Sequence, residues 1–266
     1  MKRPLAPVDS ATQNLQRYVI PNLRNACEIL KLLGTNTDGF KAADIARLLK
    51  IPVTTTLRIM ATLQLEGFVR KMDGRFELGP VLIPLGNASL AGTEIREAAI
   101  PILQELTANT VETSHLAIPC DERALIVAVQ DSPHPLRAAS RPGYLAELHC
   151  SSTGKLFLAF LYASRTAELM EKNKPIRRTA HTLTTMAEIK REVELTRKRR
   201  FSLDNEEYHV GVRCLAAPVF GSDGTVVAAI GITAATVRFP KERIPEFADV
   251  VTAAADKLSR SLGYTG

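Results

Sequence analysis

The sequence predicts an α+β protein with two domains: an N-terminal helical domain that ends in a short hairpin, and a C-terminal domain of helices packed on one sheet. Two observations support this division. Apolar residues between positions 22 and 65 recur every three or four residues, as amphipathic helices require. From residue 113 onward, strand-like and helix-like runs alternate, with short connections between neighbouring strands. A chain of 266 residues is long enough to bury two separate cores.

Two helices are expected to open the N-terminal domain. Asn22 is a candidate cap for a first helix that runs through about Leu33. The second helix is expected from about Lys41 to Leu49, because Pro52 interrupts the helical pattern soon afterwards. Its buried stripe is expected to consist of Ala42, Ile45, Ala46 and Leu49.

A third helix is expected at the threonine run of residues 54–56, whose hydroxyls can cap its first turn. The side chains expected to pack inward are Leu57, Met60, Leu63 and Leu65. The opposite edge of this helix then stays exposed, as does the recognition helix that helix-turn-helix proteins insert into the major groove of DNA. On that edge, hydroxyls can bond phosphates or bases, and Arg58 can read guanine with two hydrogen bonds.

A basic hairpin is expected directly after the third helix. Phe68–Lys71 and Arg75–Leu78 alternate like strands, and the Asp73-Gly74 pair between them fits a type I′ turn. The order helix, turn, helix, hairpin is typical of a winged helix-turn-helix domain. The candidate DNA contacts are Val53, Thr54, Thr55, Thr56 and Arg58 on the helix, and Arg70, Lys71 and Arg75 on the hairpin. A helical bundle with a solvated hairpin is the alternative.

The distribution of charge favours double-stranded DNA as the partner. Residues 1–80 contain 12 Lys or Arg and 7 Asp or Glu, a net charge of +5, whereas residues 81–266 contain 22 and 21, a net charge of +1. The basic excess therefore lies almost wholly in the predicted DNA-binding domain. RNA-binding modules usually carry stacking aromatic residues, and this chain has no Trp and few Tyr or Phe.

The domain boundaries follow from these patterns. Residues 1–21 are expected to form a flexible arm, 22–80 the winged helix-turn-helix domain, 81–110 a connector helix and 111–266 the second domain. The connector is best defined from Glu94 to Asn109, with a kink or restart at Pro101. Its apolar side chains are a candidate self-association surface, and a packed linker is the alternative. These side chains are Ile95, Ile102, Leu103 and Leu106.

The second domain is expected to contain five strands and four helices. The strands are expected near 114–119, 124–130, 201–205, 213–220 and 226–233. The helices are expected near 152–162, 165–172, 186–200 and 244–262. Residues 120–123 and 221–224 read as tight turns between consecutive strands, so helices packed on an antiparallel sheet are the predicted architecture.

Composition indicates a soluble cytoplasmic protein with reduced thiols, without a membrane partner. The basic start of the chain is not followed by an apolar stretch, and the longest apolar run, near Val226–Val237, is too short to span a bilayer. Cys27, Cys120, Cys150 and Cys214 show no paired spacing for zinc or for a disulfide framework. No metal and no cofactor are therefore expected.

Two stretches resemble hallmark segments of the IclR family of bacterial transcriptional regulators. They are ELHCSSTGKLFLAFL at 147–161 and SLDNEEYHVGVRCLAAPVFGSDGTVVAAIGITAATVRF at 202–239, and the resemblance extends from residue 22 to the C-terminus. It implies an N-terminal winged helix and a C-terminal GAF-like effector domain, in dimers that often pair into tetramers on DNA. Small organic acids or aromatic carboxylates are the ligands that the resemblance implies.

The effector site is expected around the start of the helix near residue 152. Hydroxyls and free N–H groups of Ser151, Ser152, Thr153 and Gly154 converge there, where the helix dipole favours an anion such as a carboxylate. The positions that the resemblance assigns to the pocket are Ala138, Ala146, Ser152, Thr153, Asp204, Val212, Cys214, Gly231 and Thr233. Gly231 replaces a residue that often carries a hydroxyl in the family, and Ala138 and Ala146 are smaller than the usual aliphatic residues. Val53 stands where the family frequently has Lys.

Several alternatives remain open. Asp204 can cap a turn instead of contacting a ligand, and Cys150 and Cys214 can be small buried side chains. An enzyme would use one of these thiols as nucleophile with His149 or His209 as base, and the same four residues could gather around a metal. An architectural DNA binder without effector is a third class. The leading hypothesis is a ligand-controlled transcription factor.

Overall fold

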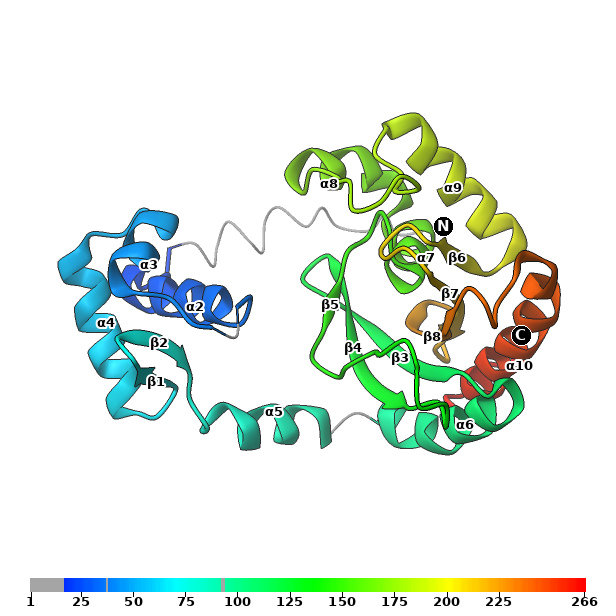
Figure 1. Ribbon diagram of the computed structural model, residues 1–266, viewed down its shortest axis with the longest axis horizontal. Coiled ribbons are helices and arrows are strands. Elements are labelled where there is room, and N and C mark those ends of the chain that lie inside the picture. Colours follow the sequence, from blue (N-terminus) through cyan, green and yellow to red (C-terminus); the bar gives the residue numbers. More distant parts are fainter. Residues whose placement is uncertain (1–16, 37, 92–93) are drawn as a thin grey trace, which may run out of the picture. The chain divides into compact units, whose positions relative to one another are not determined.

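The computed structural model describes residues 17–36, 38–91 and 94–266, which fall into two compact units, residues 1–91 and 92–266 (Figure 1). Most of the flexible arm expected at residues 1–21 lies outside the described residues. No helix among the described residues is long and apolar enough to cross a membrane.

The first described helices of the first unit are α2 (Pro21–Leu33) and α3 (Ala42–Leu49). Pro21 occupies the first turn of α2, where its fixed φ and missing N–H suit a helix start, so Asn22 lies inside the helix and does not cap it. Lys50 ends α3 in the left-handed conformation with φ 54°, which lets its N–H reach the carbonyls of Ala46 and Arg47.

Helix α4 (Val53–Leu65) begins one residue earlier than expected, and its threonines lie within it. Pro52 is the residue that precedes its first turn, and no side chain caps that turn. The buried stripe consists of Thr56, Ile59 and Met60, whereas Leu57 and Leu65 are 49% and 86% exposed. The expectation that Leu57 and Leu65 pack inward is therefore wrong. In the first turn of α4, the buried position is occupied by the polar residue Thr56.

The hairpin is formed by strands β1 (Val69–Met72) and β2 (Arg75–Leu78), with Met72 paired to Arg75. Asp73 and Gly74 both have positive φ, at 47° and 76°, as the type I′ turn requires. Phe76 bridges back to Phe40 before α3, and this contact ties the hairpin to the helices. The core that holds the domain together consists of Ile29, Leu33, Ile45, Ile51, Ile59, Met60, Val69 and Phe76.

Two helices, rather than one connector helix, occupy residues 81–110. They are α5 (Leu82–Ala91) in the first unit and α6 (Glu94–Thr110) in the second, and α6 continues through Pro101. Helix α6 packs against α10 (Ile244–Ser261) and against strands of the C-terminal sheet. Ile102, Leu103 and Leu106 are buried in these contacts, so these three side chains are not available for the self-association surface expected on this helix, whereas Ile95 is only half-buried.

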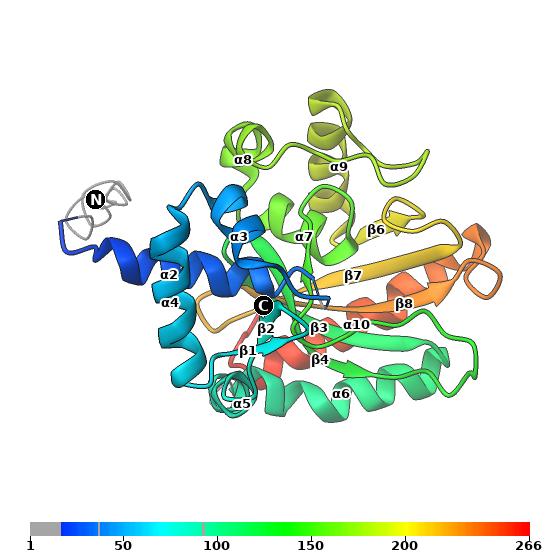
Figure 2. The same cartoon turned by 60° about the vertical axis from the view of Figure 1, so that its left-hand side comes forward.

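The second unit contains one six-stranded antiparallel sheet with the order β5-β4-β3-β8-β7-β6 (Figure 2). Its strands are β3 (Thr113–Cys120), β4 (Arg123–Gln130), β5 (Leu145–Ala146), β6 (Ser202–Asn205), β7 (Val212–Phe220) and β8 (Val226–Ala235). Five of them match the expected strands within two residues at each end. No sequence pattern predicts β5, because its two residues are too few to show an alternation of polar and apolar side chains.

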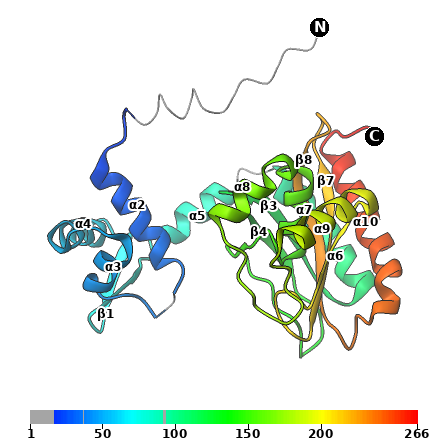
Figure 3. The same cartoon turned by 90° about the horizontal axis from the view of Figure 1, so that it is seen from above.

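Helices cover both faces of this sheet (Figures 2 and 3). Helices α6 and α10 pack together on one face, where α10 lies against β7 and β8. The other face carries α7 (Ser152–Phe160), α8 (Thr166–Lys172) and α9 (Met186–Arg199), with short 3-10 turns at Ala163–Arg165 and Lys241–Arg243 elsewhere in the chain. The main core lies under α7, where Leu156 and Phe157 meet Ala216, Ala229 and the other apolar residues of that face. The chain is therefore α+β, as the sequence predicted.

Candidate functional site

The outer surface of α4 presents most of the side chains expected to contact DNA. Val53 is 51% exposed, Thr54 and Arg58 are exposed, and Thr55 is half-buried. Thr56 is different, because its side chain is fully buried and its hydroxyl donates to the carbonyl of Pro52 at 3.2 Å. Thr56 therefore stabilises the helix from inside, and its expected role as a DNA contact is wrong.

The three basic residues of the hairpin are exposed, but each already has a neighbour within the unit. Arg70 donates to Glu77 Oε2 with two nitrogens at 2.9 and 3.1 Å, and Arg75 donates to the carbonyl of Gly39 at 3.1 Å. Lys71 Nζ lies 5.5 Å from the centre of the Phe76 ring. Since exposed ion pairs contribute only about 0–1 kcal/mol, a phosphate can replace Glu77 at Arg70 at small cost. Lys71 is the hairpin cation without a hydrogen-bonding partner among the described residues.

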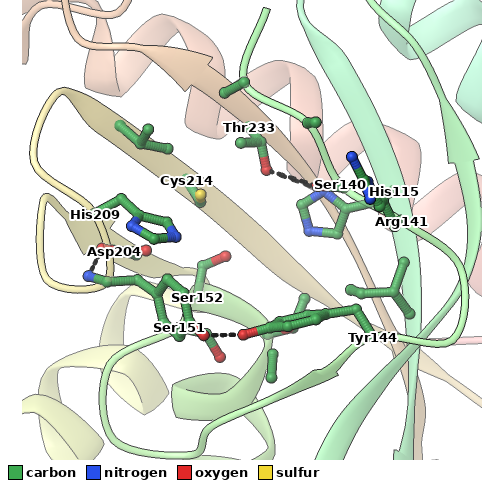
Figure 4. Close-up of a pocket in the computed structure, with 17 residues that line it drawn as sticks. His115, Ser140, Arg141, Tyr144, Ser151, Ser152, Asp204, His209, Cys214 and Thr233 are labelled. Carbon is green, nitrogen blue, oxygen red and sulfur yellow. Dashed lines mark hydrogen bonds between the residues drawn. The ribbon is translucent and has the colours of Figure 1, made fainter. Parts of the chain in front are cut away.

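The second unit encloses a cavity of about 430 Å³ on the α7 face of the sheet (Figure 4). Eight of the ten residues expected in the effector site line it. They are Ala138, Ala146, Ser152, Thr153, Asp204, Val212, Cys214 and Thr233. Its volume falls within the range of small-molecule sites, roughly 300–1,000 Å³.

The strand register explains why distant segments meet in this cavity. Asp204 on β6 lies opposite Cys214 on β7, and Cys214 lies opposite Thr233 on β8. Directly paired residues of antiparallel strands project from the same face, so these three side chains form a row across the sheet. Ser140 adds a hydroxyl 3.3 Å from Thr233 Oγ1 (Figure 4).

The N-terminus of α7 forms another wall of the cavity. Ser151 caps this helix: its Oγ accepts a hydrogen bond from Gly154 N at 3.0 Å and donates to the carbonyl of Glu147 at 2.6 Å. The N–H groups of Ser152 and Thr153 stand in the first turn, where no intrahelical acceptor exists, and both residues line the cavity. An anion at this wall would meet both N–H groups and the positive end of the helix dipole.

Two expected site residues do not line the cavity. The N–H of Gly154 is already donated to Ser151, and a Cβ at this position would lie 2.1 Å from the carbonyl oxygen of Glu147. A Cβ at Gly231 would lie 2.3 Å from the carbonyl oxygen of Leu215. Both glycines therefore allow close backbone contacts. Their expected contact with an effector is not supported.

Asp204 is the carboxylate among the lining residues, and it is almost fully buried. Burial raises its pKa to about 7, and the neighbouring Glu207 adds to the increase, while Lys155 and the backbone N–H groups of Glu207 and Tyr208 oppose it. These N–H groups donate to Asp204 Oδ1 at 2.8 and 3.2 Å. Asp204 therefore both caps the turn and faces the cavity, so the two alternatives for this residue are compatible.

A buried ionic cluster lies behind Asp204. Lys155 Nζ is 2.5 Å from Glu207 Oε1 and 3.3 Å from Glu192 Oε1, and it also donates to the carbonyl of Leu203. Burial raises the pKa of Glu207, and Lys155 opposes that increase. The cluster joins α7, α9 and the segment after β6, which fixes the backbone around Asp204.

The two cysteines that an enzyme would use are poor nucleophiles. Burial raises the pKa of both thiols, with a further increase from Glu147 at Cys150 and from Asp204 at Cys214. Both thiols therefore stay protonated near neutral pH, whereas a nucleophilic cysteine needs its thiolate.

Glu147, His149 and Cys150 could in principle bind a metal ion, because their potential ligand atoms lie within 4.8 Å of one another. However, Arg178 already makes two hydrogen bonds to the Glu147 carboxylate, at 2.6 and 2.9 Å. Cys150 Sγ donates to the same carboxylate at 3.3 Å. These side chains satisfy one another, and the grouping does not include Cys214 or His209, which line the cavity instead.

Several lining residues of the cavity were not predicted from the sequence. They include His115, Ile126, Ala139, Ser140, Arg141, Tyr144, Tyr208 and His209. His115 is buried, and burial lowers its pKa to about 4, so its ring is neutral near pH 7 and lies 3.4 Å from Thr233 Oγ1. Tyr144 and Tyr208 contact each other through their hydroxyls, and Arg178 lies over the Tyr208 ring, 4.1 Å from its centre. These residues are far apart in the sequence, and the order of the strands in the sheet brings them to the same cavity.

Two family profiles match the chain. Residues 23–73 match the IclR helix-turn-helix domain, and residues 87–260 match the C-terminal domain of the bacterial transcriptional regulator IclR. The second match alone spans more than half of the chain, and the first covers α2 to the hairpin turn.

Relatives and solved structures agree with these profiles. The chain is 29% identical to the HTH-type transcriptional regulator XynR of Escherichia coli, covering 92% of this chain and 98% of XynR. It is 32% identical to the glycerol operon regulatory protein of Streptomyces griseus, covering 92% and 97%. The crystal structure of Thermotoga maritima IclR is 31% identical, covers 92% of this chain and 99% of that one, and superposes with a TM-score of 0.66. This chain therefore belongs to the IclR family of transcriptional regulators, whose members bind DNA through a helix-turn-helix domain and are not enzymes.

Proposed function

We propose that this protein is a ligand-responsive regulator that reads operator DNA with α4 and senses a small organic acid in the cavity of its second unit. The observation that carries this proposal is the placement of Asp204, Cys214 and Thr233 in one row beside the N-terminus of α7. The second unit would then act as a GAF-like effector domain that binds its ligand in this cavity. Because operator DNA lies in the cytoplasm, the protein is expected to act there.

DNA recognition is assigned to the exposed edge of α4 and to the hairpin. Val53, Thr54, Thr55 and Arg58 stand on the outer side of α4, where they would reach base edges in the major groove. Arg70, Lys71 and Arg75 on the hairpin would contact phosphates, which positions the helix without reading sequence. The concentration of basic charge in residues 1–80 supports the assignment of DNA binding to this part of the chain.

The effector is assigned a carboxylate that binds at the start of α7. The N–H groups of Ser152 and Thr153 would hold its oxygens, and Asp204 would be protonated or would accept a hydrogen bond from a ligand hydroxyl. Ala138, Ala146 and Val212 supply apolar walls for the rest of the molecule. An architectural DNA binder would have no use for a cavity lined in this way, so that alternative is disfavoured.

Self-association as a dimer, or as a dimer of dimers, would place two reader helices on paired half-sites. The first unit supports this, because it exposes large apolar side chains that a partner copy could cover. They are Leu23, Leu65, Ile83 and Leu85, which are 51–86% exposed. This surface replaces the one expected on α6.

The test has two parts, one for binding of DNA and one for binding of an organic acid. The protein selects duplexes from a random-sequence DNA pool, and thermal-shift assays measure whether simple monocarboxylates stabilise it. The proposal expects an enriched sequence motif and a melting temperature that rises with acid concentration, as binding to the folded state requires. Replacement of Thr153 by Pro removes one of the proposed N–H donors and is expected to reduce the shift. A selected motif without any stabilising acid would support the architectural alternative.

A further inference from the structure

Arg141 contributes an unpaired positive charge to the effector cavity. Among the described residues that line the cavity, it is the one Lys or Arg side chain. Its guanidinium makes no hydrogen bond or ion pair with any described residue. Nearby arginines differ: Arg137 pairs with Asp131 at 3.0 Å, and Arg238 pairs with Glu112 through two nitrogens. Ion pairs therefore neutralise Arg137 and Arg238, whereas the guanidinium of Arg141 stays available for a ligand.

The backbone of Arg141 is held firmly although its side chain has no partner. Arg141, Pro142, Gly143 and Tyr144 form a tight turn in which Tyr144 N donates to the carbonyl of Arg141 at 3.2 Å. Pro142 fixes one central φ, and Gly143 supplies the positive φ of 87° that the other central position requires. Ile126 of β4 holds the turn in place, because it accepts from Gly143 N at 2.8 Å and donates to Tyr144 O at 2.9 Å. Such anchoring lowers the entropy cost of using this side chain for binding.

The charges of the cavity are arranged on different walls. Arg141 lies beside His115, whereas Asp204 and Ser152 lie on the other side of the drawn space (Figure 4). His115 is not a second cation, because burial lowers its pKa to about 4. A carboxylate held at the start of α7 would therefore leave the guanidinium of Arg141 without a counter-charge. A planar guanidinium forms its strongest contacts with carboxylates and phosphates through paired hydrogen bonds.

We propose that Arg141 is the specificity-determining residue of the cavity, and that it selects an organic acid with a second anionic group. The inference rests on the proposed function, because it needs the first carboxylate to occupy the start of α7. A dicarboxylate with an apolar spacer fits the lining, since Ile126, Ala138, Ala146 and Val212 contribute apolar surface to the same cavity. The chemical class is thus a diacid rather than a monoacid.

Matched pairs of acids test this proposal by isothermal titration calorimetry on the full chain. Each pair has the same carbon skeleton with one or two carboxylates, for example butyrate with succinate, hexanoate with adipate, and benzoate with the three phthalates. In the wild type, the best diacid is expected to bind at least about tenfold more tightly than its monoacid partner, as an added charge-assisted hydrogen bond allows. Arg141→Gln should remove this preference by lowering diacid affinity much more than monoacid affinity. Arg137→Gln, on the same loop but outside the cavity, is the matched control and should keep the preference.

The outcomes separate this inference from the proposed function. If monoacids bind but every diacid binds equally or more weakly in the wild type, the role of Arg141 is overturned while the carboxylate site stands. A preference for diacids that survives Arg141→Gln overturns it as well, as does an equal loss of monoacid and diacid affinity in that variant. If no acid of either kind binds, both the carboxylate site and the diacid inference fail. Melting temperatures of the two variants, expected to match the wild type because both side chains are exposed, exclude misfolding.

Discussion

Asp204 and Cys214 lie directly opposite each other in the antiparallel strands β6 and β7, so their side chains leave the same face of the sheet and enter the same cavity. The negative charge of Asp204 contributes to the raised pKa of the Cys214 thiol, while burial and Glu207 raise the pKa of Asp204 to about 7. The pair therefore offers a thiol that keeps its proton and a carboxyl that titrates near neutral pH.

The titration of Asp204 predicts how acid binding depends on pH. An ionised Asp204 repels a ligand carboxylate, whereas the protonated form can donate a hydrogen bond to it, so affinity should fall as pH rises through about 7. Ligands that are fully ionised above pH 6 keep their own titration out of the measurement. Calorimetry between pH 6 and 8 should show this decline in the wild type and a nearly flat profile in Asp204→Asn. Equal profiles in the two proteins would remove Asp204 from the site.

Arg58 and Lys71 are expected to contribute to DNA binding in different ways. Arg58→Ala should cost roughly 1–3 kcal/mol on the selected duplex and less on duplexes with the contacted base pair changed, because it removes a base contact. Lys71→Ala should weaken all sequences alike and reduce the slope of log affinity against log salt by about 0.9, because it removes a phosphate contact. Fluorescence anisotropy at several salt concentrations measures both effects. The same dependence on sequence and salt in both variants would contradict the assignment.

Thr56 and Thr54 provide a matched pair on one helix. Thr56→Val removes the buried hydrogen bond to Pro52 and should lower the free energy of unfolding by about 0.5–1.5 kcal/mol without changing sequence preference. Thr54→Val changes an exposed side chain and should leave stability within about 0.5 kcal/mol while it weakens DNA binding. Urea denaturation and anisotropy distinguish the two. A loss of sequence preference in Thr56→Val would show that this threonine does reach the DNA.

Gly231 is expected to tolerate no side chain. Gly231→Ser would place its Cβ 2.3 Å from the carbonyl oxygen of Leu215, and the resulting strain should cost roughly 1–3 kcal/mol. Gly86→Ala is the control, because open space surrounds this helical glycine and alanine should stabilise the helix by up to about 1 kcal/mol. Chemical denaturation compares the two variants. An unchanged stability of Gly231→Ser would show that β7 and β8 can separate at this point.

The elements of the fold were predictable wherever a pattern is local. The Asp73-Gly74 turn, five of the strands and the long helices follow from residues that are near one another in the sequence. Helix α4 shows the limit of this reasoning. Hydrophobicity ranks Leu57 above Thr56 as a buried residue, yet the hydroxyl of Thr56 donates to the carbonyl of Pro52 and the side chain is fully buried.

The cavity was only partly predictable, because its walls come from segments that the sheet order brings together. Ser151 and Ser152 indicate the start of α7 in the sequence, and a run of acidic residues indicates the segment that contains Asp204. His115 and Arg141 have no such signal. His115 enters the cavity because β3 pairs with β8, and Arg141 does so because Ile126 anchors its turn, and neither pairing can be read from nearby residues.

The most direct test of the whole account is the affinity of the full-length protein for a selected duplex, measured with and without an acid that binds the cavity. If the cavity controls the reader helix, a saturating acid should change this affinity about 5–150-fold in the wild type, which corresponds to coupling of roughly 1–3 kcal/mol. Asp204→Ala should retain acid-free DNA binding and lose the response. An affinity that stays the same with the cavity occupied would contradict the claim that the two units form one ligand-controlled switch.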